Sequence, residues 1–131
     1  MIVVDTNALV HLLLGGEQTA SARRAFGKDP EWAAPISWRS EFGNVLSMLM
    51  RRQVLSLAHA LEAAREAEVL MSGREFTVET QTVLERARES GCTAHDCEFV
   101  ALASDLRVQL VTSDREILAA FPTLAVAIER F

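Results

Sequence analysis

The chain has 131 residues, 50% apolar and 24% charged, which is enough to bury the core of one domain and too apolar for a disordered chain. Its 18 acidic and 13 basic residues give a net charge of −5, which argues against a general basic nucleic-acid binder. No apolar run approaches the roughly 20 residues that span a bilayer, and the N-terminus lacks the basic region of a signal peptide. The two cysteines, Cys92 and Cys97, are too few and too close for a disulfide framework. We therefore expect a soluble cytoplasmic protein.

Short apolar runs alternate with longer helical patterns along the chain. In the first half we expect a strand at 2–4, helices at 6–14 and 17–27, a strand at 32–34, and helices at 37–52 and 56–71. In the second half we expect a strand at 75–78, helices at 79–90 and 93–103, a strand at 109–112, a helix at 113–121 and a strand at 124–128. Strands separated by helices predict a parallel sheet covered on both faces, in a single α/β domain at residues 1–131.

Several positions predict where helices begin and end. Ser37 is expected to cap the helix after the second strand, Gly91 to end the helix at 79–90, and Thr93 to begin the next helix. The sequence from Ser113 to Glu116 has the form of a capping box. In the helix at 56–71, the residues expected to face inward are Leu57, Leu61, Ala64 and Leu70, with Glu62 and Glu66 outward.

Four acidic residues are expected at one edge of this sheet. Asp5 closes the first strand, Asp114 follows the fourth strand, and Glu41 and Asp96 lie in the first turns of two helices. Because the starts of such helices share an edge with the carboxyl ends of the strands, all four acids can converge there. Taken singly, Asp96 and Asp114 are also explained by the preference of carboxylates for helix N-termini, and Glu41 by a surface position.

Four neighbouring carboxylates repel each other unless a positive group lies among them. None of them has an obvious dedicated lysine, since Lys28 is the only one in the chain and the twelve arginines are scattered. A hard divalent cation such as Mg²⁺ or Mn²⁺ fits better, because it prefers oxygen ligands and keeps several waters. Such a site suits hydrolysis of a phosphodiester, with one ion or two.

The segments that carry these acids resemble those of the PIN domain, the nuclease fold of bacterial VapC-type toxins, over essentially the whole chain. They read Ile-Val-Val-Asp-Thr-Asn-Ala-Leu at 2–9, Pro-Ile-Ser-Trp-Arg-Ser-Glu-Phe-Gly-Asn-Val-Leu at 35–46, Ala-His-Asp-Cys-Glu-Phe-Val-Ala-Leu-Ala at 94–103 and Leu-Val-Thr-Ser-Asp-Arg at 110–115. The resemblance implies an α/β/α sandwich with a five-stranded parallel sheet. It also implies a Mg²⁺- or Mn²⁺-dependent endoribonuclease that acts on RNA, forms a homodimer and is inhibited by a partner antitoxin.

The resemblance assigns roles to individual residues. Asp5 and Asp96 are implied to bind the metal directly, while Glu41 and Asp114 bind it directly or through water. The residues implied to support this cluster are Thr6, Asn7, Thr112 and Ser113, with a hydroxyl hydrogen bond from Thr112 orienting the acids.

The chain departs from the family pattern at two positions near these acids. His95 stands where the family more often has an aromatic residue, and it could contact RNA, tune Asp96 or have no special role. Glu116 stands near a position where the family often has another acid, and a helix-capping role suits it better. The chain has no tyrosine, so stacking on bases would fall to a residue such as Trp38, for which a core position is the simpler interpretation.

Surfaces for RNA and for a partner can also be suggested. The basic residues expected around the acidic edge are Arg39, Arg51, Arg52 and Arg115. The apolar residues that could form a partner surface, if they are not ordinary core, are Leu12, Leu13, Met48 and Met50. If an antitoxin binds, we expect one of its arginines to enter the acidic pocket, because guanidinium complements carboxylates.

Two other enzyme classes with acidic sites lack key residues in this sequence. A phosphoryl-accepting receiver domain needs a lysine near its last strand, and the only lysine here, Lys28, lies far from it. A phosphatase with an aspartate nucleophile usually has a second aspartate two positions later, where this sequence has Asn7. A catalytically silent PIN-like module that binds RNA or a partner remains the alternative. If four of the 18 acids belong to one metal site, the remaining 14 acids and 13 bases give a net charge of −1, so the acidic balance no longer excludes RNA.

Overall fold

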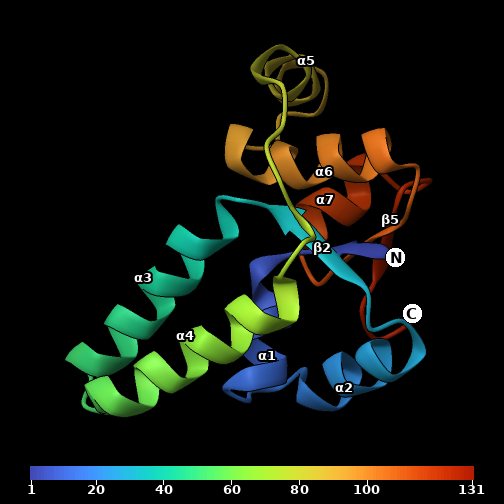
Figure 1. Cartoon of the computed structure of the whole chain (residues 1–131). Coiled ribbons are helices and arrows are strands. Elements are labelled where there is room, and N and C mark those ends of the chain that lie inside the picture. Colours follow the sequence, from blue (N-terminus) through green and yellow to red (C-terminus); the bar gives the residue numbers. More distant parts are fainter.

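The computed structural model describes all 131 residues and contains five strands and seven helices (Figure 1). The strands are β1 (Ile2–Val4), β2 (Trp32–Pro35), β3 (Glu75–Phe76), β4 (Leu110–Thr112) and β5 (Ala125–Ala127). The helices are α1 (Thr6–Leu13), α2 (Thr19–Lys28), α3 (Trp38–Arg51), α4 (Leu57–Met71), α5 (Thr80–Ser90), α6 (Ala94–Leu106) and α7 (Arg115–Ala120). The predicted order of strands and helices is therefore confirmed. None of the helices combines the length and the apolar character needed to cross a membrane.

The strands form one parallel sheet in the order β3-β2-β1-β4-β5. In Figure 1, α5 and α6 lie on one side of this sheet and α1 to α4 on the other. Residues of β1, β2 and β4 are fully buried, as expected for strands covered on both faces. The predicted three-layer α/β/α sandwich is confirmed, and it places β1 at the centre, between β2 and β4.

The edge strand β3 is shorter than the predicted strand at 75–78. It pairs only with β2, through Ala34 opposite Glu75 and Pro35 opposite Phe76. Since β2 ends at Pro35, residues 77 and 78 have no neighbouring strand to pair with. The length of β3 is set by its partner and not by its own composition.

Two of the predicted helix boundaries are confirmed. The hydroxyl of Thr93 accepts a hydrogen bond from the backbone N–H of Asp96 at 3.1 Å and caps α6. Gly91 follows α5 with φ of 75°, a left-handed conformation that glycine adopts without strain.

Two predicted caps are wrong. Ser37 already has helical backbone angles, and its side chain makes no cap hydrogen bond to α3 but donates to Glu98 instead. Ser113 does not begin a capping box either. The carboxylate of Asp114 caps α7, accepting from the backbone N–H groups of Glu116 at 2.8 Å and Ile117 at 3.0 Å. A short side chain one residue too early cannot reach those donors.

The inward face of α4 is rotated from the predicted one. Leu57 and Leu61 are 63% and 44% exposed, and Ala64 and Leu70 are half-buried. The buried residues are instead Ala60, Ala63, Ala67 and Met71. The small alanines let α4 pack closely against α1 and β2, so Leu57 and Leu61 point outward. Glu62 and Glu66 are exposed, as predicted.

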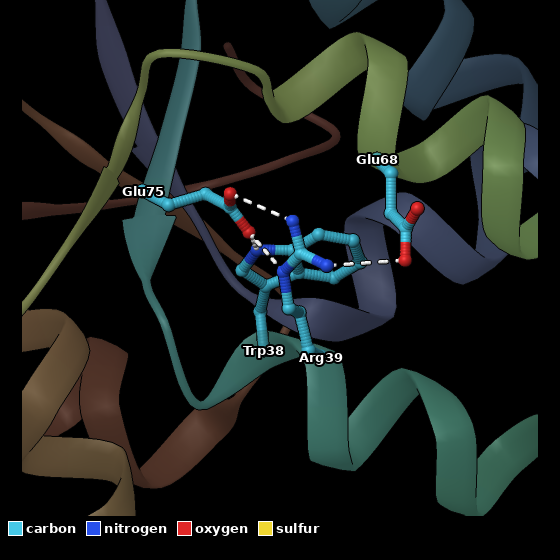
Figure 2. A network of polar contacts seen from close by, with 4 residues as sticks. All are labelled: Trp38, Arg39, Glu68 and Glu75. Atoms are coloured by element: carbon cyan, nitrogen blue, oxygen red, sulfur yellow. Dashed lines mark hydrogen bonds and ion pairs between the residues drawn. The ribbon is translucent and has the colours of Figure 1, made fainter.

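A network of polar contacts fixes the start of α3 (Figure 2). The guanidinium of Arg39 donates to both carboxylate oxygens of Glu75 on β3, at 2.6 and 2.9 Å, and to Glu68 on α4 at 3.1 Å. The buried indole of Trp38 donates to the same carboxylate of Glu75 at 2.8 Å. These bonds lower the pKa of Glu75, with the hydrogen bond from Arg39 as the largest cause. The network ties together α3, β3 and α4.

Replacing Glu75 by alanine is expected to lower the free energy of unfolding by about 1–3 kcal/mol, because the indole N–H of Trp38 loses its acceptor in the interior. The matched variant Glu68→Ala removes only an exposed partner of Arg39 and should cost less than about 0.5 kcal/mol. Because the pKa of Glu75 is lowered, its contribution is present above the ordinary glutamate pKa and is lost as the pH falls through the lowered value. Urea unfolding of both variants at neutral and acidic pH checks this, and equal losses in the two variants would contradict it.

Candidate active site

The carboxyl edge of the sheet holds a cavity of about 50 Å³. Its lining residues are Asp5, Thr6, Asn7, Glu41, Asp96, Phe99, Asp114 and Ile117. The structure therefore brings the four predicted acids together, with the two predicted small polar residues of α1. The other two predicted supporting residues, Thr112 and Ser113, lie behind the cavity and contact Asp5.

Asp5 lies at the back of this cavity, between the end of β1 and the start of α1. Its Oδ1 accepts from the backbone N–H of Ala8 at 2.9 Å, so Asp5 is also the N-cap of α1. Its Oδ2 accepts from the hydroxyl of Thr112, as the resemblance led us to expect, and from the backbone N–H of Ser113 at 3.4 Å. The side chain is thus fixed by both neighbouring elements.

Burial makes the Asp5 carboxylate hard to ionise. The residue is only 8% exposed, and its burial raises the pKa of the carboxyl above the ordinary value of 3.8. The hydrogen bonds that Asp5 accepts oppose this shift, while the nearby charge of Glu41 adds to it. A buried carboxylate beside three other acids is a position where a bound cation would be strongly favoured.

Asp114 is joined to Asp5 through Thr112. The backbone N–H of Asp114 donates to the Thr112 hydroxyl at 2.9 Å, and that hydroxyl donates onward to Asp5. This relay exists because β4 pairs directly with β1, which aligns the ends of the two strands. One Asp114 oxygen caps α7, which leaves the other free at the cavity.

Asp96 lines the cavity from the first turn of α6. Its backbone N–H is held by the Thr93 cap, and its carboxylate makes no hydrogen bond or ion pair with the protein. The cap therefore positions Asp96 while leaving both carboxylate oxygens available. Asp96 therefore lies both at the N-terminus of α6, where a carboxylate is favoured, and in the lining of the cavity.

Glu41 is contacted on both of its carboxylate oxygens. The hydroxyl of Thr6 donates to Oε2. Nε2 of His95 is buried and lies 2.6 Å from Oε1, an ion-pair distance whose angles are not those of a hydrogen bond. The acid that His95 contacts is therefore Glu41, whereas a contact with RNA, tuning of Asp96 and no special role were the three roles left open from the sequence. On its other side, Nδ1 of His95 lies 3.9 Å from a carboxylate oxygen of Glu98, which accepts from the Ser37 hydroxyl.

Sequence reasoning missed Glu98 and Ser37 as neighbours of the acids. A signal was present, because Glu98 follows His95 by three residues on α6, a spacing that places two side chains on one helix face. The position of Ser37 could not be found this way, since its contact with Glu98 joins residues 61 positions apart.

The donor set of the cavity fits a hard divalent cation. No Lys or Arg pairs with any of the four acids, and His95 is the single basic side chain in contact with them. No three or more His, Cys, Asp or Glu side chains are already arranged around a common metal position. Mg²⁺ does not require such a set, because it is commonly held by one or two carboxylates and several waters. Carboxylate, hydroxyl and amide oxygens are therefore the right donor types for it.

The residues suggested for RNA contacts have mixed positions. Trp38 is 1% exposed and packs edge-to-face on Phe42, so it belongs to the core and cannot stack on a base. Arg39 is engaged by Glu75 and Glu68. Arg51, Arg52 and Arg115 are exposed, and Glu116 is exposed outside the cavity lining.

Comparison with known proteins gives a consistent set of matches. The family model described as PIN domain matches residues 2–122. Ribonuclease VapC3 from Pyrobaculum aerophilum is 27% identical to this chain over 126 residues, which cover 94% of the chain and 96% of the relative.

Solved structures have the same fold. The crystal structure of PAE2754 from Pyrobaculum aerophilum superposes with a TM-score of 0.78 at 25% identity, covering 98% of this chain and 91% of that one. FitAcB from Neisseria gonorrhoeae gives a TM-score of 0.75 at 16% identity and covers 100% of both chains. A toxin–antitoxin complex from Klebsiella pneumoniae gives 0.69 at 20% identity and covers 98% of both chains.

Proposed function

This chain belongs to the PIN domain family, and on that premise we propose that it is a metal-dependent endoribonuclease that acts as the toxin of a toxin–antitoxin pair. The observation that carries the proposal is the cavity in which four carboxylates meet without a Lys or Arg partner. The similarity to a ribonuclease along nearly the whole chain supports RNA as the substrate. We also propose a cytoplasmic location, which agrees with RNA as the substrate.

We assign the metal to the acids of this cavity. Asp5 and Asp96 are the proposed direct ligands of Mg²⁺ or Mn²⁺, and Glu41 and Asp114 bind it directly or through water. When bound, the cation would make a water more acidic and neutralise charge on the scissile phosphate, which is the chemistry that hydrolysis of a phosphodiester needs.

The other residues of the chain orient these acids. The Thr112 hydroxyl holds Oδ2 of Asp5 and the backbone of Asp114 in one relay. The backbone N–H of Ser113 supports the same oxygen, and the Thr6 hydroxyl holds Glu41. Asn7 contributes a small polar side chain to the lining. Preorganised carboxylates need little rearrangement when a cation and a phosphate enter.

Cleavage of RNA tests this function directly. The purified chain is expected to cleave a mixed single-stranded RNA substrate with Mg²⁺ or Mn²⁺ and to lose that activity in excess EDTA, with recovery after the metal is restored. Gel analysis of labelled RNA measures the products. Binding of RNA with no cleavage of any substrate in a broad transcript library would instead favour the alternative, a catalytically silent binding module.

The partners we propose are an antitoxin protein and a second copy of the chain. Val54 just before α4, Leu57 at its start and Val69 near its end are strongly exposed apolar residues, so we propose α4 as the contact surface for a partner. Beside it lies a hollow of about 450 Å³ between α2 and α4, lined by Phe26, Glu62, Arg65, Glu66, Val69 and Leu70. Leu12, Leu13 and Met50, which the sequence suggested for a partner surface, are half-buried and pack against the core.

Light scattering on the chain alone, and on the chain mixed with the product of a neighbouring gene, measures both assemblies. A monomer that binds no such product would overturn this assignment.

A further inference from the structure

Glu41 differs from the other acids of the cavity in what holds it. Asp5 and Asp114 are fixed by the strand ends and by backbone N–H groups. Glu41 has a longer side chain on α3, and its two contacts come from other helices, Thr6 on α1 and His95 on α6. Its position toward the cavity therefore depends on side chains that reach it across the fold.

The His95 ring is itself held in place. It packs edge-to-face on Phe99 one turn further along α6, with ring centroids 5.7 Å apart and an interplanar angle of 74°. Its Nδ1 faces the Glu98 carboxylate at 3.9 Å. Glu98 accepts from Ser37, the residue that precedes α3, so these contacts connect back to the helix that carries Glu41. The ring has an aromatic contact on one side and a carboxylate near each nitrogen.

From these contacts we propose that His95 is a positioning residue that fixes the Glu41 carboxylate toward the cavity, with Glu98 and Ser37 fixing the imidazole from behind. The inference rests on the proposed function, because it concerns the same metal site. A glutamate side chain that is already ordered loses less conformational entropy when a cation binds. Residues that orient metal-site carboxylates in this way typically change metal affinity or activity by about 10- to 100-fold when they are replaced.

Binding of Mn²⁺ alone tests this without relying on catalysis. In His95→Phe, the ring keeps its contact with Phe99 but loses both nitrogens, and we expect Mn²⁺ affinity to fall about 10-fold. His95→Gln keeps an N–H donor and should recover most of that loss. The control His59→Phe changes an exposed histidine on α4 and should bind Mn²⁺ like the unaltered chain. Free Mn²⁺ is measured by electron paramagnetic resonance, and thermal unfolding verifies that each variant is folded.

A double-variant cycle separates positioning from a general structural effect. If His95 acts through Glu41, then adding His95→Phe to Glu41→Gln should lower Mn²⁺ affinity no further. A structural role would instead lower the affinity by the same factor in both backgrounds. The proposal would be overturned if the fold-losses in Mn²⁺ affinity of the two single variants multiplied in the double variant. Unchanged Mn²⁺ binding in His95→Phe would overturn it as well.

The outcome can be told apart from failure of the ribonuclease proposal. If the chain binds Mn²⁺ but cleaves no RNA, the proposed function fails while the His95 measurement still stands on its own. If the unaltered chain binds no Mn²⁺, the assignment of the cavity as a metal site is wrong, and the role of His95 is overturned with it.

Discussion

Replacing Asp5 by asparagine is expected to reduce RNA cleavage by at least about 10²- to 10³-fold and, at the same time, to make the metal-free protein more stable. The loss of activity follows from removing the most deeply placed carboxylate of the site. The gain in stability follows from burial, because the raised pKa of Asp5 shows that its charge is unfavourable in the folded state. Asparagine can still accept from the Ala8 N–H, so the cap of α1 is retained.

Two further variants make this result specific. Asp96→Asn should reduce cleavage to a similar extent but lower stability by less than about 1 kcal/mol, because its carboxylate accepts no hydrogen bond and is favoured only by the N-terminus of α6. Asp105→Asn, at an exposed position later on the same helix, should change neither property. Initial rates on labelled RNA and urea unfolding measure the two effects. An Asp5→Asn protein that cleaves RNA at the rate of the unaltered chain would show that the site is wrongly assigned.

Divalent metal is expected to reverse the pH dependence of stability that Asp5 contributes. Without metal, the folded state keeps the Asp5 proton to a higher pH than the unfolded state does. This contribution to stability is therefore present at low pH and is lost as the pH rises from the ordinary aspartate pKa of 3.8 through the raised folded value. A cation binds the ionised carboxylate, so with Mn²⁺ the stability should rise over the same range.

The size of the metal effect follows from mass action. At a free Mn²⁺ concentration about 100 times its dissociation constant, the folded state gains about 2.7 kcal/mol. Asp5→Asn should lose most of this gain and should also lose the slope with pH in the absence of metal. Thermal and urea unfolding at several pH values, with Mn²⁺ or with EDTA, provide the measurement. Equal stabilisation of both proteins by Mn²⁺ would place the cation somewhere other than beside Asp5.

The parts of the fold that depend on local pattern could be predicted from the sequence. The alternation of apolar runs and helical periods predicted the order of all twelve elements and the parallel sheet. The acids could be placed at one edge because strand ends and helix starts meet there in a doubly wound sheet. Asp5 and Asp96 were therefore expected to converge although they are far apart in the chain, and the cavity lining confirms that they do.

The parts that depend on packing between distant elements could not be predicted. Leu57 and Leu61 follow an amphipathic pattern that predicts burial, but both are exposed. The face of α4 that carries its buried alanines packs on the core instead, because small side chains allow closer packing. The sequence suggests Trp38 and Arg39 for RNA contacts, but both bind Glu75 on β3, 37 and 36 residues away, which no local pattern reveals. Ser37 looked like a cap because only the fold reveals Glu98 next to it.

The bond between Asp5 and Thr112 also bears on when the site comes into being. It joins residues 107 positions apart, and the relay to Asp114 extends the span further. Contacts this distant in sequence form only after β4 has paired with β1, at the centre of the sheet. A chain still being synthesised lacks this half of the cavity until Thr112 and Asp114 have left the ribosome. The cavity is therefore completed late in synthesis, after the N-terminal strand that precedes Asp5 has long been available to fold.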